Sequence, residues 1–258
     1  MAVFVSASDE SAGKNRQDQF IFAGLIASER DWAEIFSPAW QRLVLDGPPS
    51  IPYLHMTEMR RKSWREEQGL LVEEAERRID EAIAVIEAAK FLFPIGVKVS
   101  GADMCEQFMP FRIKSPKRKG VVFEPDFLAF LGYAMMALDF VSKENKDCEK
   151  LDFWVEQNGK ITDYIKDFHA DLNRAFTELG RPDLAKLVGE LLPVGKERMP
   201  VQAADVLCWH TARAQNPGKM DQPSYRRYER LSRKNGWLET LNRDTVQQLA
   251  DSLRACEG

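Results

Sequence analysis

Short apolar runs and segments with helical spacing alternate along the first half of the chain. Val3 to Ser8 and Phe20 to Ala27 are rich in β-branched and aromatic residues, and a polar segment that contains glycine separates them. This pattern predicts an antiparallel pair of strands joined by a hairpin-like loop. Glu29 to Leu45 carries apolar residues at a helical period and is followed by Gly47-Pro48-Pro49, so we expect a helix that ends there.

The same alternation continues through the middle of the chain. Gln68 to Lys90 has the apolar spacing of a long amphipathic helix, and Phe91 to Val99 follows it as a predicted strand. Pro125 to Lys143 is apolar on nearly every side, which is typical of a helix buried between other elements. Further strands are predicted at Leu151 to Val155 and at Lys186 to Val194.

The remaining helices complete an α/β pattern. We expect helices over Ile161 to Leu179 and Val201 to Ala214, and two more over Gln222 to Cys256, broken around Asn235-Gly236. An antiparallel pair followed by alternating strands and helices predicts a mixed central sheet flanked by helices, with residues 222–258 as a helical C-terminal extension. No stretch rich in Pro, Gly or Ser is long enough to be a linker, so residues 1–258 are expected to form a single domain.

Composition is that of a folded protein without a membrane span. Hydrophobic residues make up 44% and charged residues 29% of the chain, as in ordinary globular domains. The N-terminal residues lack the basic and apolar regions of a signal peptide, and no later stretch is apolar for long enough to cross a bilayer. We therefore expect a cytoplasmic protein with no membrane partner. The 4 cysteines are scattered, which predicts reduced, mostly buried thiols rather than disulfides or a thiolate zinc site.

The net charge argues against a general attraction to nucleic acid. It is −4, so any such affinity must be local. The clearest basic stretch runs from Arg112 to Lys119 and includes Lys117, Arg118 and Lys119. These side chains are candidates for contacts with substrate phosphates, and an ordinary solvated loop is an equally good interpretation.

Acidic residues stand at the ends of predicted strands. Asp9 follows the first strand, within Asp9-Glu10-Ser11, and Glu156 directly follows the strand at Leu151 to Val155. Carboxylates at strand ends in an α/β sheet can point into a shared crevice, which suits a metal ion. The alternatives are a turn in which Asp9 binds nearby backbone amides, and an ordinary polar strand terminus at Glu156.

Two carboxylates on predicted helical turns join this set. Asp205 lies early in a helix that is otherwise mostly apolar, where an unpaired carboxylate would be costly. It needs a partner, for which a divalent cation, a backbone amide and an arginine all qualify. Gln202, three residues earlier, shares its face of the helix. His55 and Glu58 are spaced to face the same way on a helical turn, and we hold Glu58 as an accessory candidate.

Three motifs, in order, resemble the domain-of-unknown-function family 3800. They are Asp9-Glu10-Ser11 after the first strand, Phe20 to Ile26 as the next strand, and Val201 to Leu207 in a late helix. That family typically opens with Asp-Glu-Ser-Gly, continues with an apolar strand containing glycine, and closes with a Gln-x-Ala-Asp helix. It is grouped with the ribonuclease H-like superfamily. This chain departs from the pattern at Ala12, which separates Ser11 from Gly13 and alters the turn.

The resemblance implies a ribonuclease H-like fold in which Asp9, Glu156 and Asp205 are catalytic and metal-binding carboxylates and Glu58 is a further metal ligand. The implied activity is a two-metal phosphodiester hydrolysis with Mg²⁺ or Mn²⁺, that is, a nuclease acting on DNA or RNA. Lys117, Arg118 and Lys119 would then hold substrate phosphates. The alternative is a non-catalytic module that binds nucleic acid or protein on the same fold, as a homo-oligomer or within a larger assembly.

Overall fold

The computed structural model describes the backbone of most of the chain. The described residues are 2–12, 19–103, 112–114, 119–122, 125–145, 147–157, 172, 176, 180–215, 221–234, 236–244 and 247. Within these ranges, side chains are described at all positions except 12, 112–114, 119–122, 125–128 and 237. The predicted helix from Ile161 to Leu179 lies almost entirely outside the described residues.

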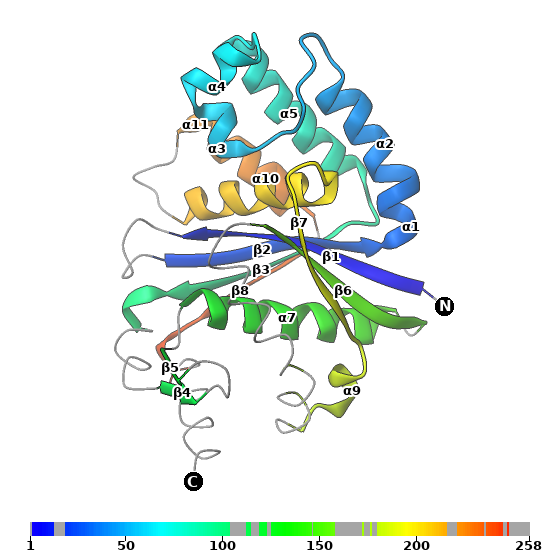
Figure 1. Ribbon diagram of the computed structural model, residues 1–258, viewed down its shortest axis with the longest axis vertical. Coiled ribbons are helices and arrows are strands. Elements are labelled where there is room, and N and C mark those ends of the chain that lie inside the picture. The colour runs from blue at the N-terminus through cyan, green and yellow to red at the C-terminus, as the bar shows by residue number, and fades with distance from the viewer. Residues whose placement is uncertain are drawn as a thin grey trace.

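A 6-stranded mixed sheet forms the centre of the fold, in the order β7-β6-β1-β2-β3-β8 (Figure 1). The strands are β1 (Ala2–Ala12), β2 (Gln19–Ser28), β3 (Phe93–Ser100), β6 (Cys148–Glu156), β7 (Val188–Val194) and β8 (Trp237–Leu241). Strand β2 runs antiparallel to both of its neighbours, whereas the pairs β1–β6, β6–β7 and β3–β8 are parallel. A separate antiparallel pair joins β4 (Arg112–Lys114) to β5 (Lys119–Val122). The predicted mixed sheet and its opening antiparallel pair are therefore confirmed.

Helices cover both faces of this sheet (Figure 1). One face carries α7 (Pro125–Glu144) and α9 (Pro182–Ala185). The other carries a continuous helical segment from Glu29 to Leu45, in which α1 (Glu29–Asp31) and α2 (Ser37–Trp40) alternate with π-helical turns at Trp32–Phe36 and Gln41–Leu45. The same face also carries α3 (Met56–Arg60), α4 (Lys62–Glu67), α5 (Val72–Ala88), α10 (Met199–Ala214) and α11 (Gln222–Ser232). None of the described helices has the length and apolarity needed to cross a membrane.

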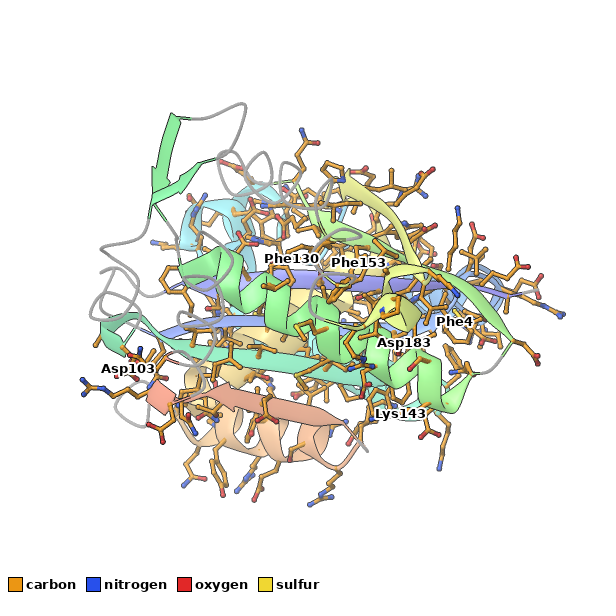
Figure 2. All side chains as sticks on the ribbon, turned by 90° about the horizontal axis from the view of Figure 1, so that it is seen from below. Phe4, Asp103, Phe130, Lys143, Phe153 and Asp183 are labelled. Carbon is orange, nitrogen blue, oxygen red and sulfur yellow. The ribbon has the colours of Figure 1, made fainter. Side chains whose placement is uncertain are left out.

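The sheet separates two hydrophobic cores, because successive side chains of a strand point to opposite faces. In the first core, α7 packs on the sheet, and Figure 2 looks onto this side of the molecule. There the ring of Phe130 on α7 meets that of Phe153 on β6 edge to face, with the centroids 6.0 Å apart. The second core lies under α10, α5 and the helical segment that begins at Glu29. The buried helix expected at Pro125 to Lys143 is thus found against the sheet.

The predicted helical extension at residues 222–258 is wrong in part. Helix α11 is present, but Trp237–Leu241 forms strand β8, which pairs in parallel with β3. Leu241 is buried in the α7-side core, and Leu238 lies over Gly96, where an added Cβ would approach its Cδ1 to 2.9 Å. Pairing with the edge of β3 satisfies backbone groups and buries Leu241, which outweighs the weak local pattern of a five-residue segment.

The long amphipathic helix also begins later than the predicted Gln68. Gly69 adopts a positive φ of 65°, a conformation that ends α4 rather than continuing it, and α5 starts at Val72. Arg78 of α5 is fully buried and donates to the backbone carbonyls of Val44, Gly47 and Pro49. This one guanidinium therefore ties α5 to the turn that ends the first helical segment.

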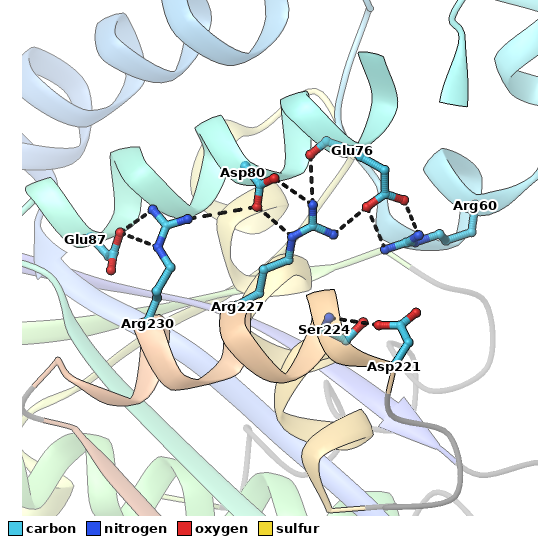
Figure 3. A network of polar contacts seen from close by, with 8 residues as sticks. All are labelled: Arg60, Glu76, Asp80, Glu87, Asp221, Ser224, Arg227 and Arg230. Carbon is cyan, nitrogen blue, oxygen red and sulfur yellow. Dashed lines mark hydrogen bonds and ion pairs between the residues drawn. The ribbon is translucent and has the colours of Figure 1, made fainter. Parts of the chain in front are cut away.

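Ion pairs fasten α11 to α5 (Figure 3). Arg227, 4% exposed, donates to both oxygens of Asp80 at 2.7 and 2.9 Å and to Glu76 Oε2 at 2.6 Å. Arg230 binds Glu87 one turn further on. Glu76 also accepts from Arg60, so the same carboxylate joins α3 to both helices.

Candidate functional site

Alternation along β1 decides which way Asp9 faces. Val5 and Ala7 belong to the core under α10, whereas Ser6 Oγ lies 2.6 Å from Tyr133 Oη on α7, at the opposite face. Asp9 continues the series of Val5 and Ala7, and its side chain therefore faces α10. It is 6% exposed.

Glu156 reaches the same face from the neighbouring strand. Ser8 of β1 is paired with Val155 of the parallel strand β6, so Asp9 and Glu156 are the next residues at the same end of both strands. Val155 belongs to the α7-side core and Trp154 packs on the α10 side, so Glu156 also faces α10. The carboxyl ends of parallel strands are where α/β sheets form crevices for ligands.

Helix α10 supplies the third buried carboxylate. Asp205 is 5% exposed, and its Oδ2 accepts a hydrogen bond of 2.6 Å from the backbone N–H of Met56. Its side chain lies close enough to that of Asp9 for the two carboxyl groups to shift each other's pKa. Two buried carboxylates this close repel each other, so a proton or a cation must compensate one of the charges.

The remaining groups of the cluster come from α3 and from the loop after β7. His55 lies between two carboxylates, with Nε2 3.9 Å from Glu156 Oε1 and Nδ1 3.8 Å from Glu58 Oε2. Lys196 Nζ lies 3.3 Å from Glu58 Oε1 and 3.9 Å from Glu156 Oε1. We call Asp9, Glu58, Glu156 and Asp205, with His55 and Lys196, the carboxylate cluster.

Gln202 fixes the backbone around this cluster. Its Oε1 accepts from Trp40 Nε1 at 2.8 Å and from the N–H of Leu54 at 3.0 Å, and its Nε2 donates to the carbonyl of Lys196 at 2.7 Å. Gln202 and Asp205 together therefore hold the amides on both sides of His55, at residues 54 and 56. The face that the two residues share on α10 therefore positions the backbone of two other segments around the cluster.

Burial dominates the electrostatics of the two aspartates. Desolvation raises the pKa of Asp9 well above its ordinary value, and the carboxylates of Asp205, Glu10 and Glu156 raise it further. Desolvation likewise raises the pKa of Asp205 to about 7, with the Met56 amide opposing the rise and Glu156 adding to it. Since the two aspartates interact, they take up protons as a pair.

Burial also shifts the pKa values of Glu156 and His55, which flank the two aspartates. Burial raises the pKa of Glu156, and the ammonium of Lys196 offsets part of this rise. Burial lowers the pKa of His55 to about 4, helped by Lys196, so the imidazole is neutral at pH 7. The cluster thus has a deficit of positive charge near neutral pH, which protons or a cation can supply.

We expect the Asp205→Asn variant to gain stability relative to wild type as the pH rises from 5 to 8 in EDTA. A carboxyl whose pKa is raised on folding stabilises the native state below its unfolded pKa and loses that contribution as the pH rises through the folded pKa, here about 7. Asn has no such titration, so the difference in melting temperature between variant and wild type should grow with pH. Thermal unfolding followed by circular dichroism measures it.

Asp139→Asn is the matched control for that experiment. Hydrogen bonds from Lys143 and Arg181 lower the pKa of Asp139 against the opposing effect of burial, so this carboxyl titrates below pH 5. The difference in melting temperature between Asp139→Asn and wild type should therefore stay constant from pH 5 to 8. If the difference in melting temperature between Asp205→Asn and wild type is also independent of pH, the cluster has no deficit of positive charge near neutral pH.

The donor set suits a hard divalent cation, but the side chains do not enclose one. Carboxylate oxygens are the ligands that Mg²⁺ and Mn²⁺ prefer. Within the described part of the chain, no group of three or more His, Cys, Asp or Glu side chains is arranged closely enough to hold a metal ion. The ammonium of Lys196 lies among these oxygens instead, at 3.3 Å from Glu58.

The sequence-based candidates fall into two groups. Asp9, Glu156, Asp205 and Glu58 come together from β1, β6, α10 and α3. Lys117 and Arg118 lie outside the described residues, and so does the side chain of Lys119, whose backbone begins β5. The basic segment is therefore not located relative to the carboxylate cluster.

Lys196 is the residue that the sequence interpretation missed. The signal for it was present, because Glu156 pairs with Val194 at the end of β7 and Lys196 follows two residues later. A cation just after a strand that neighbours an acidic strand end lies at the same edge of the sheet.

A scan of family models and a search of curated proteins found no match to the chain.

Proposed function

We propose that this chain is a Mg²⁺- or Mn²⁺-dependent phosphodiester hydrolase acting on nucleic acid, built on a ribonuclease H-like version of the α/β fold. One observation carries the proposal: Asp9, Glu156 and Asp205 come from separate elements to one place, are buried, and all have raised pKa values. Burying three carboxylates together is unfavourable unless a cation or protons compensate them.

The donor chemistry of the cluster fits such a cation. Asp9, Glu156 and Asp205 would hold it, and Glu58 is the further oxygen ligand within reach of Lys196. His55 Nδ1 and Glu58 Oε2 are buried, lie 3.8 Å apart, and have no hydrogen-bond partner among the described residues. When bound, divalent ions supply activation of water and stabilisation of the leaving oxygen in phosphodiester hydrolysis.

The protein's own groups prepare the site for this chemistry. The Met56 N–H fixes the orientation of Asp205, and Gln202 holds the backbone of Leu54 and Lys196. Lys196 lends one positive charge to Glu58 and Glu156, which lowers the repulsion within the cluster before substrate arrives. Neutral His55 adds no charge and offers its ring nitrogens as hydrogen-bonding groups.

A non-catalytic module remains the second candidate, because Lys196 already lies among the carboxylates. In that case the ammonium is the permanent counter-ion of Glu58 and Glu156, and the cluster has a structural role. Nucleic acid or protein would then be bound elsewhere on the same fold.

Incubation of the purified protein with labelled DNA and RNA, in EDTA, Mg²⁺ and Mn²⁺, separates the two candidates. The proposed activity requires cleavage of at least one substrate in Mg²⁺ or Mn²⁺ and none in EDTA. Lys196→Met adds a second comparison, since removing a permanent counter-ion should lower the melting temperature in EDTA, and divalent ions should restore it only if they bind the cluster. Absence of cleavage from all substrates, with no effect of the ions on stability, favours the module.

A further inference from the structure

Helices α3 and α10 lie side by side, and on both of them acidic side chains near the carboxylate cluster are followed by arginines further along the helix. At one end, Asp205 of α10 accepts from the Met56 amide at the start of α3. At the other, the guanidinium of Arg60, the last residue of α3, lies 5.3 Å from the ring centroid of Trp209 on α10. Glu58 belongs to the carboxylate cluster and Arg60 lies beyond it. The pair of helices therefore forms a path that leads away from the cluster.

Spacing along α10 extends this path. Asp205, Trp209 and Arg213 are four residues apart, so they lie on one face of the helix. The rise of a helix puts Trp209 about 6 Å and Arg213 about 12 Å from Asp205 along its axis. Both Trp209 and Arg213 are partly exposed. We call Arg60, Trp209 and Arg213 the basic stripe.

The two arginines of the stripe differ in their partners. Arg60 is held by Glu76, which also accepts from Arg227 (Figure 3), so its position is fixed and much of its charge is compensated. Arg213 lies over the Trp209 ring, 4.1 Å from its centroid, and its Nε is buried and has no hydrogen-bond partner among the described residues. A guanidinium stacked on an aromatic face keeps its N–H donors directed away from the ring, where an anion can accept them.

The interior beneath the stripe contains a buried histidine near three arginines. His210 is fully buried, and neither of its ring nitrogens has a hydrogen-bond partner in the described part of the chain. Burial, followed by the charges of Arg227, Arg60 and Arg213, lowers its pKa to about 3. Besides Glu76, Asp221 is an acidic side chain near Arg60 and Arg213, and its carboxylate caps α11 by accepting from the Ser224 N–H at 2.8 Å.

We propose that the basic stripe binds single-stranded nucleic acid and leads it into the carboxylate cluster, with Arg213 and Arg60 contacting phosphates and Trp209 contacting a base. This inference rests on the proposed nuclease function and names its substrate form. Positive side chains interleaved with an aromatic ring are the usual means of binding a single strand. The stripe is one helix face wide, which suits one backbone rather than the two of a duplex. The distance of about 12 Å along the helix axis from Asp205 to Arg213 corresponds to a few nucleotides, since phosphates of one stacked strand are about 3.4 Å apart along the axis.

The test is binding of fluorescein-labelled oligo-dT and oligo-U in EDTA, where cleavage is excluded, at several salt concentrations. Arg213→Ala should weaken binding about tenfold and reduce the slope of log K against log salt by about 0.7, the value for one phosphate contact of a single strand. Arg30→Ala is the matched control, because it removes an arginine that is exposed and paired with Glu34 on α1. It should leave affinity and slope unchanged.

Trp209 also packs at the edge of the core, so it is tested with two variants, Trp209→Ala and the more conservative Trp209→Phe. Trp209→Ala should weaken binding about tenfold, and Trp209→Phe should retain most of the affinity because every base can stack on a phenyl ring. Equal affinities and salt slopes for wild type, Arg213→Ala and Arg30→Ala overturn the inference. Tighter binding of a duplex, with the same loss in Arg213→Ala, overturns the assignment to a single strand.

Separate measurements of binding and of cleavage distinguish the proposed nuclease function from the proposed role of the basic stripe. Loss of binding in Arg213→Ala, together with no cleavage by wild type in Mg²⁺ or Mn²⁺, supports the stripe and contradicts the nuclease function. Metal-dependent cleavage by wild type that is unaffected in Arg213→Ala supports the nuclease function and contradicts the stripe.

Discussion

The Asp9→Asn variant is expected to lose metal-dependent cleavage by a factor of about 10³ or more. Asn has the shape of Asp but removes a negative charge and the proposed metal-binding oxygen, at a position that is 6% exposed and close to Glu156 and Asp205. Metal ions supply several kcal/mol of transition-state stabilisation, and about 1.4 kcal/mol corresponds to a tenfold change in rate. Single-turnover cleavage of a labelled substrate in Mn²⁺ measures the loss.

Two further measurements make this result specific. Binding of single-stranded nucleic acid in EDTA should be as tight as in wild type or tighter, since the basic stripe is intact and one repelling charge is gone. Asp152→Asn is the matched control on β6, where Asp152 Oδ1 accepts from the Glu190 N–H at 2.7 Å outside the cluster. If Asp9→Asn cleaves the substrate as fast as Asp152→Asn, Asp9 is not a catalytic residue.

The largest loss of stability is expected from Arg78→Met, which should lower the free energy of unfolding by about 3 kcal/mol. Met fills much of the same volume but leaves the carbonyls of Val44, Gly47 and Pro49 without their charged donor. For a chain of this size, such a change corresponds to a decrease in melting temperature of about 10 °C. Urea titration and thermal unfolding, both followed by circular dichroism, give the two quantities.

The neighbouring arginine provides the control. Arg77 is half exposed and pairs with Glu81 one turn along the same helix, so Arg77→Met should change stability by less than about 0.5 kcal/mol. If the two variants unfold at the same urea concentration, the buried guanidinium does not hold α5 to the turn at Gly47.

Local pattern was sufficient to predict most of the sheet and its helices. Short runs rich in β-branched and aromatic residues predicted β1 and β2, the run from Leu151 to Val155 predicted β6, and the segment that is apolar on nearly every side predicted α7. It failed at β8, because Trp237–Leu241 is too short to show a period and becomes a strand only by pairing with β3. It also failed at residues 68–71, where Gly69 separates two helices that the apolar spacing joins.

The candidate site was predicted where position along an element implies position in space. Asp9 and Glu156 stand at the same end of parallel neighbours, and an acid early in an apolar helix needs a partner, so their convergence with Asp205 follows from pattern. Gln202 acts through contacts that no local pattern contains, such as its bond to Trp40, 162 residues away. The positions of such side chains are set by tertiary packing alone.

The central claim is that the carboxylate cluster binds divalent metal in exchange for protons, and a calorimetric titration of the protein with Mn²⁺ at pH 6.5 tests it most directly. Repeating the titration in two buffers of different ionisation enthalpy gives the number of protons released. Because burial raises the pKa of Asp9 and raises that of Asp205 to about 7, wild type should show saturable binding with proton release, and Asp9→Asn and Asp205→Asn should each lose most of the affinity. Absence of binding to wild type, or equal binding with equal proton release in both variants, would contradict the account.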